Sequence, residues 1–464
     1  MDGCFEWAAE EFGGAQLDDE RRPVRLVHMA ARVASNPSGL VTRVFRNPAE
    51  REGAYRFLES PLIDDDAVAA PMFAATAKRC AKAARILVAI DQSTVSIVDK
   101  TGNKGLGRTS TLSKTTSRRG FEVMSALAVL PSGQSAGLLA QQWHLRKEER
   151  TKVRRRDDRP IEERESDLWR LCMEAMVGVL KEVAPKVRPW VQMDRGADIS
   201  HVLLAASRLN IDFTIRSSSN RCVEPFGYIR DKIRSSRVLG VATLMIPDSH
   251  AAPGEPRVRP LKFAVRARRL PIRLNNSRGV RIATLPLTVV HIREMHTGGT
   301  DPIEWYLLTN RYVATLNEAL EVVRNYSLRW RVEEFHRAWK SGVCDLEKSQ
   351  LRSAPALRRW ATILAAVATR AERLKFGSRT TPDLPATSEL SRDEIDAAIL
   401  LSTTIKFKRG DSLTLAQAVE LIALVGGYTG RKNAGGPPGA STIARGLADV
   451  AIAVNAIELY KSSG

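Results

Sequence analysis

The chain has 464 residues, 44% of them hydrophobic, which is enough for two or three domains with a sizeable core. Lys and Arg number 71 against 52 Asp and Glu, giving a net charge of +19 and a pI near 10.0. This excess favours a polyanionic partner, with nucleic acid first. No uncharged run reaches the roughly 18 residues of a membrane-spanning helix, so the composition argues against a membrane protein.

The N-terminus and the cysteines indicate a cytoplasmic location. The opening segment MDGCFEWAAEEF is acidic and lacks the basic-then-apolar pattern of a secretory signal. The cysteines are odd in number and show no CxxC spacing, which is typical of free thiols in a reducing compartment. They are Cys4, Cys80, Cys172, Cys222 and Cys344.

Residues 1 to about 75 are predicted to form short helices. In the second, Asp18 or Asp19 is the expected N-cap, and Arg21, Arg22 and Arg25 cluster in the first turn. Cations there oppose the helix dipole, so helix stability alone does not explain them. Contact with DNA phosphates would explain them, and a solvated basic helix is the alternative.

From Arg85 onward, apolar runs of strand length alternate with turns. Three or four strands are followed by a helix, a strand ending at VQMDRGAD, a second helix and the strand DFTIRS. This order resembles that of an RNase H-like fold, which is α/β with a mixed sheet flanked by helices. The charged run from 143 to 164 is predicted to be a solvated arm that orders on DNA.

Residues 224–310 return to β pattern and read as an inserted β-subdomain. Its segment RARRLPIRL places basic residues along an extended chain, suited to following a phosphate backbone. After Gly342 the periodicity is helical, and the last helix, beginning near Ile443, is apolar on nearly half its circumference. That face suits either a core or self-association.

The stretch NYSLRWRVEEFHRAWKSG, residues 325–342, is predicted to be one helix with two distinct faces. With Tyr326 at zero, a polar stripe falls at roughly 300°, 340°, 20° and 320° around the axis. An apolar stripe lies opposite and is expected to pack into a core. The polar stripe consists of Arg329, Glu333, Arg337 and Lys340. A lone carboxylate among cations suits a metal ligand beside a phosphate backbone, and solvated helix charges are the alternative.

The spacing of Tyr326, Arg329, Glu333 and Lys340 resembles the signature of DDE transposases of the insertion-sequence-four family. The surrounding words RWRVEEFHRAWK are most similar to the Tn5 branch. DERRPVRLV and EGAYRFL resemble that branch's N-terminal transposon-end-binding domain. The resemblance extends from near residue 5 to near residue 350.

Asp91, Asp194 and Glu333 are the candidate catalytic and metal-binding residues. Two Mg²⁺ ions, with Mn²⁺ able to substitute, would activate the nucleophile and stabilise the leaving oxygen, and hard cations prefer carboxylate ligands. Like charges this close repel, so the site is expected to be poorly ordered without metal. The chain has no HExxH, P-loop or GxSxG motif, so zinc hydrolysis, nucleotide-driven work and serine chemistry lack support.

The register of the first carboxylate has two alternatives. Ungapped comparison with the Tn5 branch puts Gln92 at the Asp position, one residue after Asp91. A shift of one residue turns a strand side chain to the other face unless a bulge restores it. Asp91 is the preferred ligand, Asp99 is the fallback, and a damaged site is the third possibility.

By resemblance, Tyr326, Arg329 and Lys340 would bind the phosphate beside the scissile bond, with Arg337 on the same stripe. Trp305 matches the aromatic residue on which an extruded base stacks, and Arg216 matches a basic position of the branch. A core tryptophan is the alternative for Trp305.

The resemblance implies a cut-and-paste DNA transposase that acts as a homodimer in a synaptic complex. It would bind double-stranded DNA at terminal inverted repeats, cleave through a hairpin, and join the ends to target DNA in the bacterial nucleoid. The rivals are a transposase-derived DNA-binding protein without catalysis and an RNase H-like nuclease that never joins strands. The expected domains are end binding (1–75), catalysis (76–375, with the β-insertion at 224–310) and dimerisation (376–464).

Overall fold

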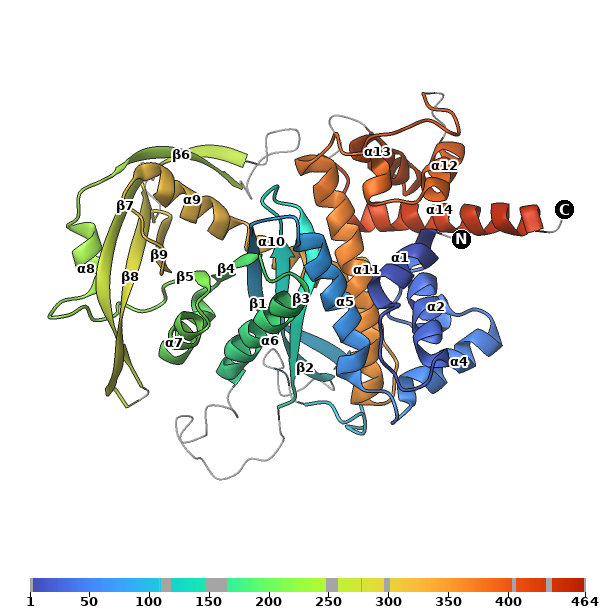
Figure 1. Cartoon of the computed structure of the whole chain (residues 1–464), viewed down its shortest axis with the longest axis horizontal. Helices are drawn as coiled ribbons and strands as arrows, with labels where there is room; N and C mark the ends of the chain where they lie inside the picture. Colours follow the sequence, from blue (N-terminus) through green and yellow to red (C-terminus); the bar gives the residue numbers. More distant parts are fainter. Residues whose placement is uncertain are drawn as a thin grey trace.

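The structure is a computed structural model of the whole chain (Figure 1). It describes residues 3–107, 109, 118–146, 165–247, 258–276, 278–295, 301–402, 406–430 and 436–462. Most of the predicted charged arm, residues 147–164, lies outside the described residues.

Helices gather at the two ends of the chain and strands in its middle (Figure 1). The strands are β1 Arg85–Val98, β2 Arg118–Val129, β3 Ser135–His144, β4 Arg188–Met193, β5 Asp212–Arg216, β6 Gly240–Pro247, β7 Val258–Asn275, β8 Arg281–Glu294 and β9 Glu304–Thr309. The helices are α1 Gly3–Phe12, α2 Arg21–Ser35, α3 Val41–Val44, α4 Pro48–Glu59, α5 Asp65–Cys80, α6 Leu168–Val183, α7 Ser200–Arg208, α8 Ile229–Arg234, α9 Leu316–Ser327, α10 Trp330–Lys340, α11 Ala354–Thr380, α12 Arg392–Leu401, α13 Leu415–Val425 and α14 Ala440–Ser462.

The strands form one nine-stranded mixed sheet in the order β3-β2-β1-β4-β5-β9-β8-β7-β6. Strands β1, β4 and β5 are parallel, and the other pairings are antiparallel. Strand β9 continues the sheet because Thr214–Arg216 of β5 pair with Leu307–Thr309. The strands β6–β9 of the predicted β-insertion, which we call the β-extension, therefore lengthen the central sheet. The predicted α/β class with a mixed, helix-flanked sheet is confirmed.

Strand β1 has two different faces, and this alternation positions the site. Ala89, Val95 and Ile97 belong to the core that includes α10 and α11, whereas Val88 and Ile90 belong to the core that includes α6 and α7. Successive side chains of a strand point to opposite faces. Odd-numbered residues of β1 therefore face α10. Strand β1 runs unbroken through Asp91 to Ser96 because β2 pairs with it along this stretch.

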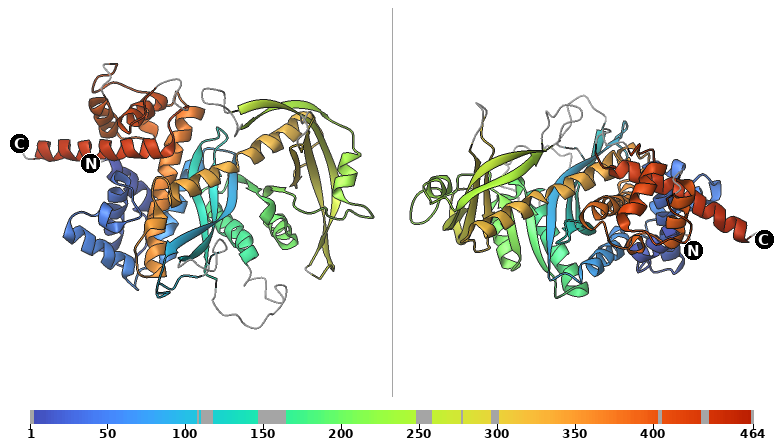
Figure 2. Two further views of the ribbon diagram at one scale, coloured as in Figure 1. Left: turned by 180° about the vertical axis from the view of Figure 1, so that it is seen from behind. Right: turned by 90° about the horizontal axis from the view of Figure 1, so that it is seen from above.

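Helices α9 and α10 are where the sequence predicted one helix. The backbone N–H groups of Leu328 and Arg329 donate to residues three positions back, Asn325 and Tyr326, at 3.2 and 3.0 Å. This tighter turn interrupts the regular four-residue ladder and ends α9 at Ser327. The two helices still run in sequence across the sheet, from the β-extension toward the helical half (Figure 2). The single-helix prediction was wrong at this turn.

The N-terminal helices pack on α11 and share its hydrophobic core. Helix α2 begins at Arg21 with Glu20 at its N-cap, and neither predicted cap is used. Asp18 adopts a positive φ of 60°, and Asp19 instead accepts from the backbone N–H of Arg21 at 3.0 Å. The expected boundaries at 75/76 and 375/376 fall inside α5 and α11, so these two helices are shared between neighbouring domains.

Helix α11 connects the half that contains the sheet to the C-terminal helices α12–α14, which form a further core. Among the described residues, Ala440–Ile457 of α14 is one stretch long and apolar enough to cross a membrane. Its Ile443, Leu447 and Val450 are buried against the other C-terminal helices, as in a core helix.

Candidate active site

Asp91 lies on the face of β1 that meets α10. Its Oδ2 accepts from Arg329 Nη1 at 2.7 Å, and its Oδ1 accepts from the backbone N–H of Gln92 at 2.9 Å. Two residues on, the hydroxyl of Ser93 accepts from Lys340 Nζ at 3.2 Å. The odd-numbered residues of β1 thus meet the basic residues of the predicted signature.

Arg329 joins two of the three candidate catalytic carboxylates. Its Nη2 donates to Glu333 Oε1 at 2.6 Å while its Nη1 holds Asp91. The arginine side chain is 8% exposed, so this contact is far less screened than a surface ion pair. Asp91 and Glu333, 242 positions apart in sequence, therefore share one guanidinium.

Asp194 lies at the end of the neighbouring parallel strand. Ile90 of β1 and Met193 of β4 are the last residues that pair between these two parallel strands. Asp91 and Asp194 directly follow them, so both lie at the same end of this strand pair. Asp194 begins the short 3₁₀ turn Arg195–Ala197 and accepts from the backbone N–H of Gly196 at 2.7 Å. Asp194 lies in a loop because the apolar strand β4 ends at Met193, directly before Asp194 and Arg195.

The pKa of Asp91 shows that the three carboxylates act on one another. Burial raises this pKa to about 6, Arg329 opposes the rise, and the charges of Asp194 and Glu333 add to it. Burial also lowers the pKa of Arg329, but the charges of Asp91 and Glu333 and the hydrogen bond to Glu333 oppose burial, and the net shift is upward. The guanidinium therefore stays charged and partly neutralises a cluster of like charges.

Residue types at this edge fit a hard divalent cation. Carboxylate oxygens are the ligands that Mg²⁺ prefers, and three carboxylates from separate elements face one region. Within the described ranges, no group of three His, Cys, Asp or Glu side chains is already arranged around a single point. Arg329 lies between Asp91 and Glu333, so the carboxylates would hold a metal after that guanidinium moves.

The register of β1 distinguishes the two candidate first carboxylate positions. Gln92 points to the opposite face, where its Nε2 donates to Glu122 Oε2 at 3.2 Å. Thr94 donates to the same oxygen at 2.8 Å. The fallback Asp99 is 2% exposed, and its carboxylate accepts from the backbone N–H of Gly102 at 2.9 Å, so it serves a turn. Asp91 is the carboxylate of this strand that meets Arg329.

Other residues of the predicted polar stripe lie in different surroundings. Lys340 Nζ lies 3.8 Å from Glu347 Oε1 and also donates a hydrogen bond to the hydroxyl of Ser93. Arg337 is exposed and makes no ion pair with any described residue. Tyr326, expected to contact phosphate, is only 4% exposed, because it lies in the last turn of α9 and packs against residues of the β-extension.

Trp305, Tyr326 and Arg216 form an aromatic cluster beside the carboxylates. The Trp305 and Tyr326 rings meet edge to face with centroids 5.4 Å apart, and the Arg216 guanidinium lies 5.5 Å from the Trp305 centroid. Burial lowers the pKa of Arg216, as do the nearby charges of Arg195 and Arg329. Trp305 is partly exposed, so its ring is not enclosed in a core.

The three candidate arginines of α2 differ in their contacts. Arg21 forms a 2.8 Å ion pair with Asp19, and Arg22 donates to the backbone carbonyl of Leu17 at 2.9 Å. Arg25 packs over Gly53 of α4, where a Cβ would lie 3.1 Å from its Nη1. Arg21 and Arg25 border a hollow of about 620 Å³ between α2 and α4, also lined by His28 and Arg32, whereas Arg22 does not line it.

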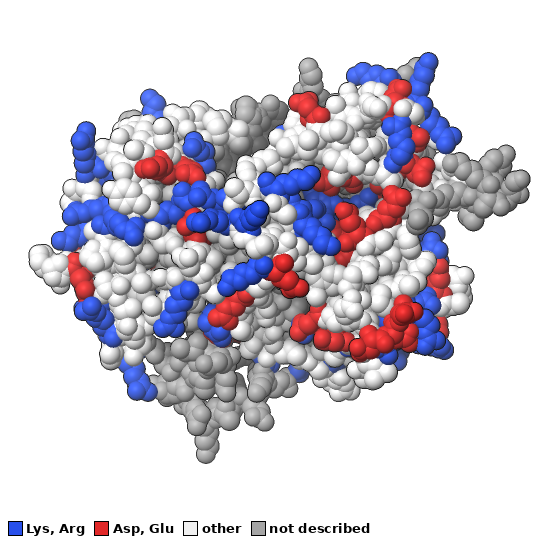
Figure 3. All heavy atoms as spheres, viewed as in Figure 1, with Lys and Arg blue, Asp and Glu red and all other residues white. Residues whose placement is uncertain are grey.

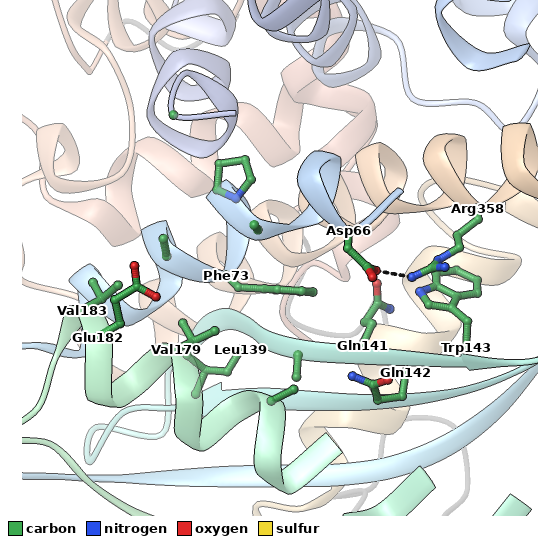
Figure 4. Close-up of a pocket in the computed structure, with 16 residues that line it drawn as sticks. Asp66, Phe73, Leu139, Gln141, Gln142, Trp143, Val179, Glu182, Val183 and Arg358 are labelled. Carbon is green, nitrogen blue, oxygen red and sulfur yellow. Dashed lines mark hydrogen bonds and ion pairs between the residues drawn. The ribbon is translucent and has the colours of Figure 1, made fainter. Parts of the chain in front are cut away.

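Charge is unevenly distributed over the molecule. On the face in Figure 3, Lys and Arg predominate over the β-extension, while most Asp and Glu lie over the helical half. A separate cavity of about 650 Å³ lies between α5, α6 and the edge strand β3 (Figure 4). It is lined by Phe73, Leu139 and Trp143 and closed on one side by the Asp66–Arg358 ion pair. None of the candidate catalytic residues lines it.

Sequence reasoning missed two buried polar residues near the site. His336 on α10 is 6% exposed, and burial lowers its pKa to about 3, helped by Lys340 and Arg329. Asp198, four residues after Asp194, is 5% exposed and fully hydrogen-bonded. The only signal for Asp198 in the sequence was that it is a second aspartate in DRGAD, and spacing alone does not distinguish such a residue from a helix N-cap.

Three family models match the chain in the order of its domains. Residues 5–63 match a transposase DNA-binding model, residues 144–370 a transposase DDE domain, and residues 366–463 the transposase Tn5 dimerisation domain. The DDE match includes Asp194 and Glu333, whereas Asp91 precedes it. Matches to all three parts confirm the resemblance predicted from the signature, and the chain belongs to the Tn5 branch of the DDE transposases.

Proposed function

We propose that this transposase cleaves and joins DNA strands at the edge formed by Asp91, Asp194 and Glu333. The observation that carries the proposal is the Arg329 guanidinium shared by Asp91 and Glu333 beside Asp194. A cluster of carboxylates held together by one buried cation is suited to exchange that cation for metal. The same edge carries the basic and aromatic groups needed to hold a DNA strand.

Asp91, Asp194 and Glu333 would hold two Mg²⁺ ions, with Mn²⁺ able to substitute. When bound, these ions activate the attacking oxygen and stabilise the leaving oxygen of an in-line displacement. Arg329, released from its carboxylates, would donate both arms of its guanidinium to phosphate oxygens. Lys340 would add a point charge beside Ser93, and Arg337, which has no described ion-pair partner, would reach the adjoining backbone.

Trp305 would stack an extruded base during hairpin formation. In that step the freed 3′-hydroxyl attacks the opposite strand, and water later reopens the hairpin before the end joins target DNA. A hairpin bends the strand sharply, so removing one base from the stack relieves the bend. Stacking on an aromatic ring contributes roughly 1–3 kcal/mol per base. Arg216 and Tyr326 would keep the Trp305 ring in position.

The remaining parts would bring two DNA ends together. Residues 1–75 would bind the terminal inverted repeats, with Arg21, Arg22 and Arg25 contacting DNA phosphates. Residues 376–464 would pair two protomers in a synaptic complex. Residues 76–375 would carry the chemistry and receive target DNA. A DNA-bound homodimer of this kind would act at the bacterial nucleoid.

The test uses a labelled duplex that carries the element's own terminal repeat, taken from inverted repeats flanking its reading frame. Incubation of the full-length protein with Mg²⁺ should give a nick, then a hairpin, then a joined product on a denaturing gel. Binding without any strand cleavage would instead indicate a transposase-derived DNA-binding protein. Cleavage without a joined product would indicate a nuclease.

A further inference from the structure

Asp198 is a buried carboxylate that the proposed chemistry does not use. It directly follows the 3₁₀ turn that begins at Asp194, and its side chain is 0% exposed. Its Oδ2 accepts from the backbone N–H groups of Ser218 and Ser219 at 2.7 and 3.0 Å. The hydroxyl of Ser217 donates to the same oxygen at 3.1 Å. Consecutive backbone N–H groups thus form a small anion-binding loop around it.

Arg221 completes the surroundings of Asp198. Its Nε donates to Asp198 Oδ1 at 2.7 Å and its Nη2 to the backbone carbonyl of Asp198 at 2.6 Å. A third donor, Nη1, lies 3.3 Å from the hydroxyl of Ser200. A buried charge is costly unless it is paired and hydrogen-bonded, and Asp198 meets both conditions. With both oxygens occupied by described donors, this carboxylate is unsuited to bind metal.

The contacts of Asp198 join the two halves of the proposed site. On one side it is continuous with the turn that carries Asp194. On the other it holds the loop that follows Arg216, the last residue of β5. The backbone N–H of Ser217 donates to the carbonyl of Tyr306 at 2.8 Å, one residue beyond Trp305. The Asp198 carboxylate therefore links the turn that carries Asp194 to the loop beside the aromatic cluster.

We propose that Asp198 is a positioning residue that fixes Asp194 and the Arg216–Trp305 pair relative to each other. The inference rests on the proposed function, because it assigns metal to Asp194 and an extruded base to Trp305. Both groups would be displaced together if the Asp198 loop loosened. Carboxylates that support metal ligands from outside commonly change metal affinity by 10–100-fold when removed.

The test compares Asp198→Asn with wild type in the full-length protein by two readouts. Tb³⁺ alone, a hard oxygen-seeking ion, reports on the carboxylates through luminescence sensitised by nearby aromatic rings. A duplex of the terminal repeat with 2-aminopurine at the extruded position reports on Trp305. We expect about tenfold weaker Tb³⁺ binding and a reduced 2-aminopurine response.

Asp167→Asn is the matched control. Asp167 is 1% exposed and is held by two N–H groups of Arg170 at 2.8 and 2.7 Å, at the start of α6. Asp167→Asn therefore shows how much of any effect comes simply from losing a buried ion pair. Wild-type values in Asp198→Asn for either readout would overturn the inference, as would equal losses in Asp167→Asn.

Arg221→Lys serves as a second variant if Asp198→Asn fails to fold. It keeps the charge but loses the fork that holds both the carboxylate and the carbonyl of Asp198. Both readouts should weaken in the same direction, and wild-type values would overturn the inference. Wild-type protein that gives neither signal would contradict the proposed function itself, and the inference with it. If wild type gives both signals and the variants give wild-type values, the inference is overturned but the proposed function stands.

Discussion

Arg329 Nη1 lies 2.7 Å from Asp91 Oδ2, although 238 positions separate the two residues in sequence. The contact holds α10 against β1 and brings the signature residues to Asp91, which lies just beyond the last residue of β1 that pairs with β4. It also neutralises part of the charge that Asp91, Asp194 and Glu333 accumulate. The proposed activity requires that the Arg329 guanidinium leave these carboxylates and that metal ions take its place.

Replacing Glu333 by Gln, or Asp194 by Asn, should abolish Mg²⁺-dependent cleavage while leaving DNA-end binding unchanged. Each change keeps the size of the side chain but removes a charged oxygen ligand. Gel shifts measure binding, and denaturing gels measure cleavage. Glu334→Gln is the control, because Glu334 instead pairs with Arg331 and Lys375 at 3.1 and 3.2 Å. Nicking retained by either variant would remove that residue from the catalytic set.

Trp305→Ala should slow hairpin formation, with less effect on the first nick. Loss of roughly 1–3 kcal/mol of stacking corresponds to about 5–150-fold in that step. Quenched-flow sampling resolves the nick from the hairpin. Trp305→Phe keeps an aromatic face and should recover most of the rate. Equal rates in Trp305→Ala and wild type would place this ring outside the reaction.

Arg21→Ala and Arg25→Ala should each weaken end binding and reduce its salt dependence. Each lost phosphate contact is expected to lower the slope of log affinity against log salt by about one. Fluorescence anisotropy over a salt series measures this. Arg208→Ala, an exposed cation on α7, is the control for net charge. An unchanged slope in both α2 variants would contradict the assignment of this helix to phosphate contacts.

Deleting residues 1–75 is a poorer test of that assignment. Glu11 of α1 lies 3.3 Å from Arg373 and 2.8 Å from Arg79, with the glutamate side chain 1% exposed. Removing the segment would leave Arg373 buried with one fewer partner, and lost binding could then reflect damage to α11. Point substitutions on α2 keep these contacts.

His336 should make stability fall in acid. Burial lowers its pKa in the folded chain to about 3 from an ordinary 6.5, so the unfolded chain binds the proton first. The stabilisation is present above pH 6.5 and is lost as pH falls toward 3, at up to about 1.4 kcal/mol per pH unit. Relative to wild type, His336→Gln should lack this slope in urea unfolding at several pH values. Parallel curves for the two proteins would contradict the burial argument.

The sequence was sufficient for the fold class because helix and strand periods, and the order of elements, follow from local patterns. The single helix drawn through Tyr326 and Glu333 failed because the break at Leu328–Arg329 depends on a tighter turn with no Gly or Pro to signal it. Continuity of β9 with β5 was not visible either, since strand pairing between distant segments is set by tertiary packing.

The candidate site was predictable in part for the same reason. Spacing led to the prediction of Arg329 and Glu333, and the ends of apolar runs led to Asp91 and Asp194, although β1 continues beyond Asp91. The guanidinium between Asp91 and Glu333 was not foreseen, because a helical wheel gives a direction and not a partner on another element. Asp198 was missed because its donors, Ser218, Ser219 and Arg221, become neighbours only when β5 pairs beside β4.

The central claim is tested most directly by Mg²⁺-dependent cleavage of pre-bound end DNA with Asp91→Asn and Gln92→Asp. Asp91 faces Arg329, whereas Gln92 faces Glu122 on the other side of β1. We therefore predict that Asp91→Asn is as inactive as Glu333→Gln. Gln92→Asp should be tolerated or mildly harmful, since it adds a charge beside Glu122. Nearly inert wild-type protein that gains cleavage from Gln92→Asp would contradict the account.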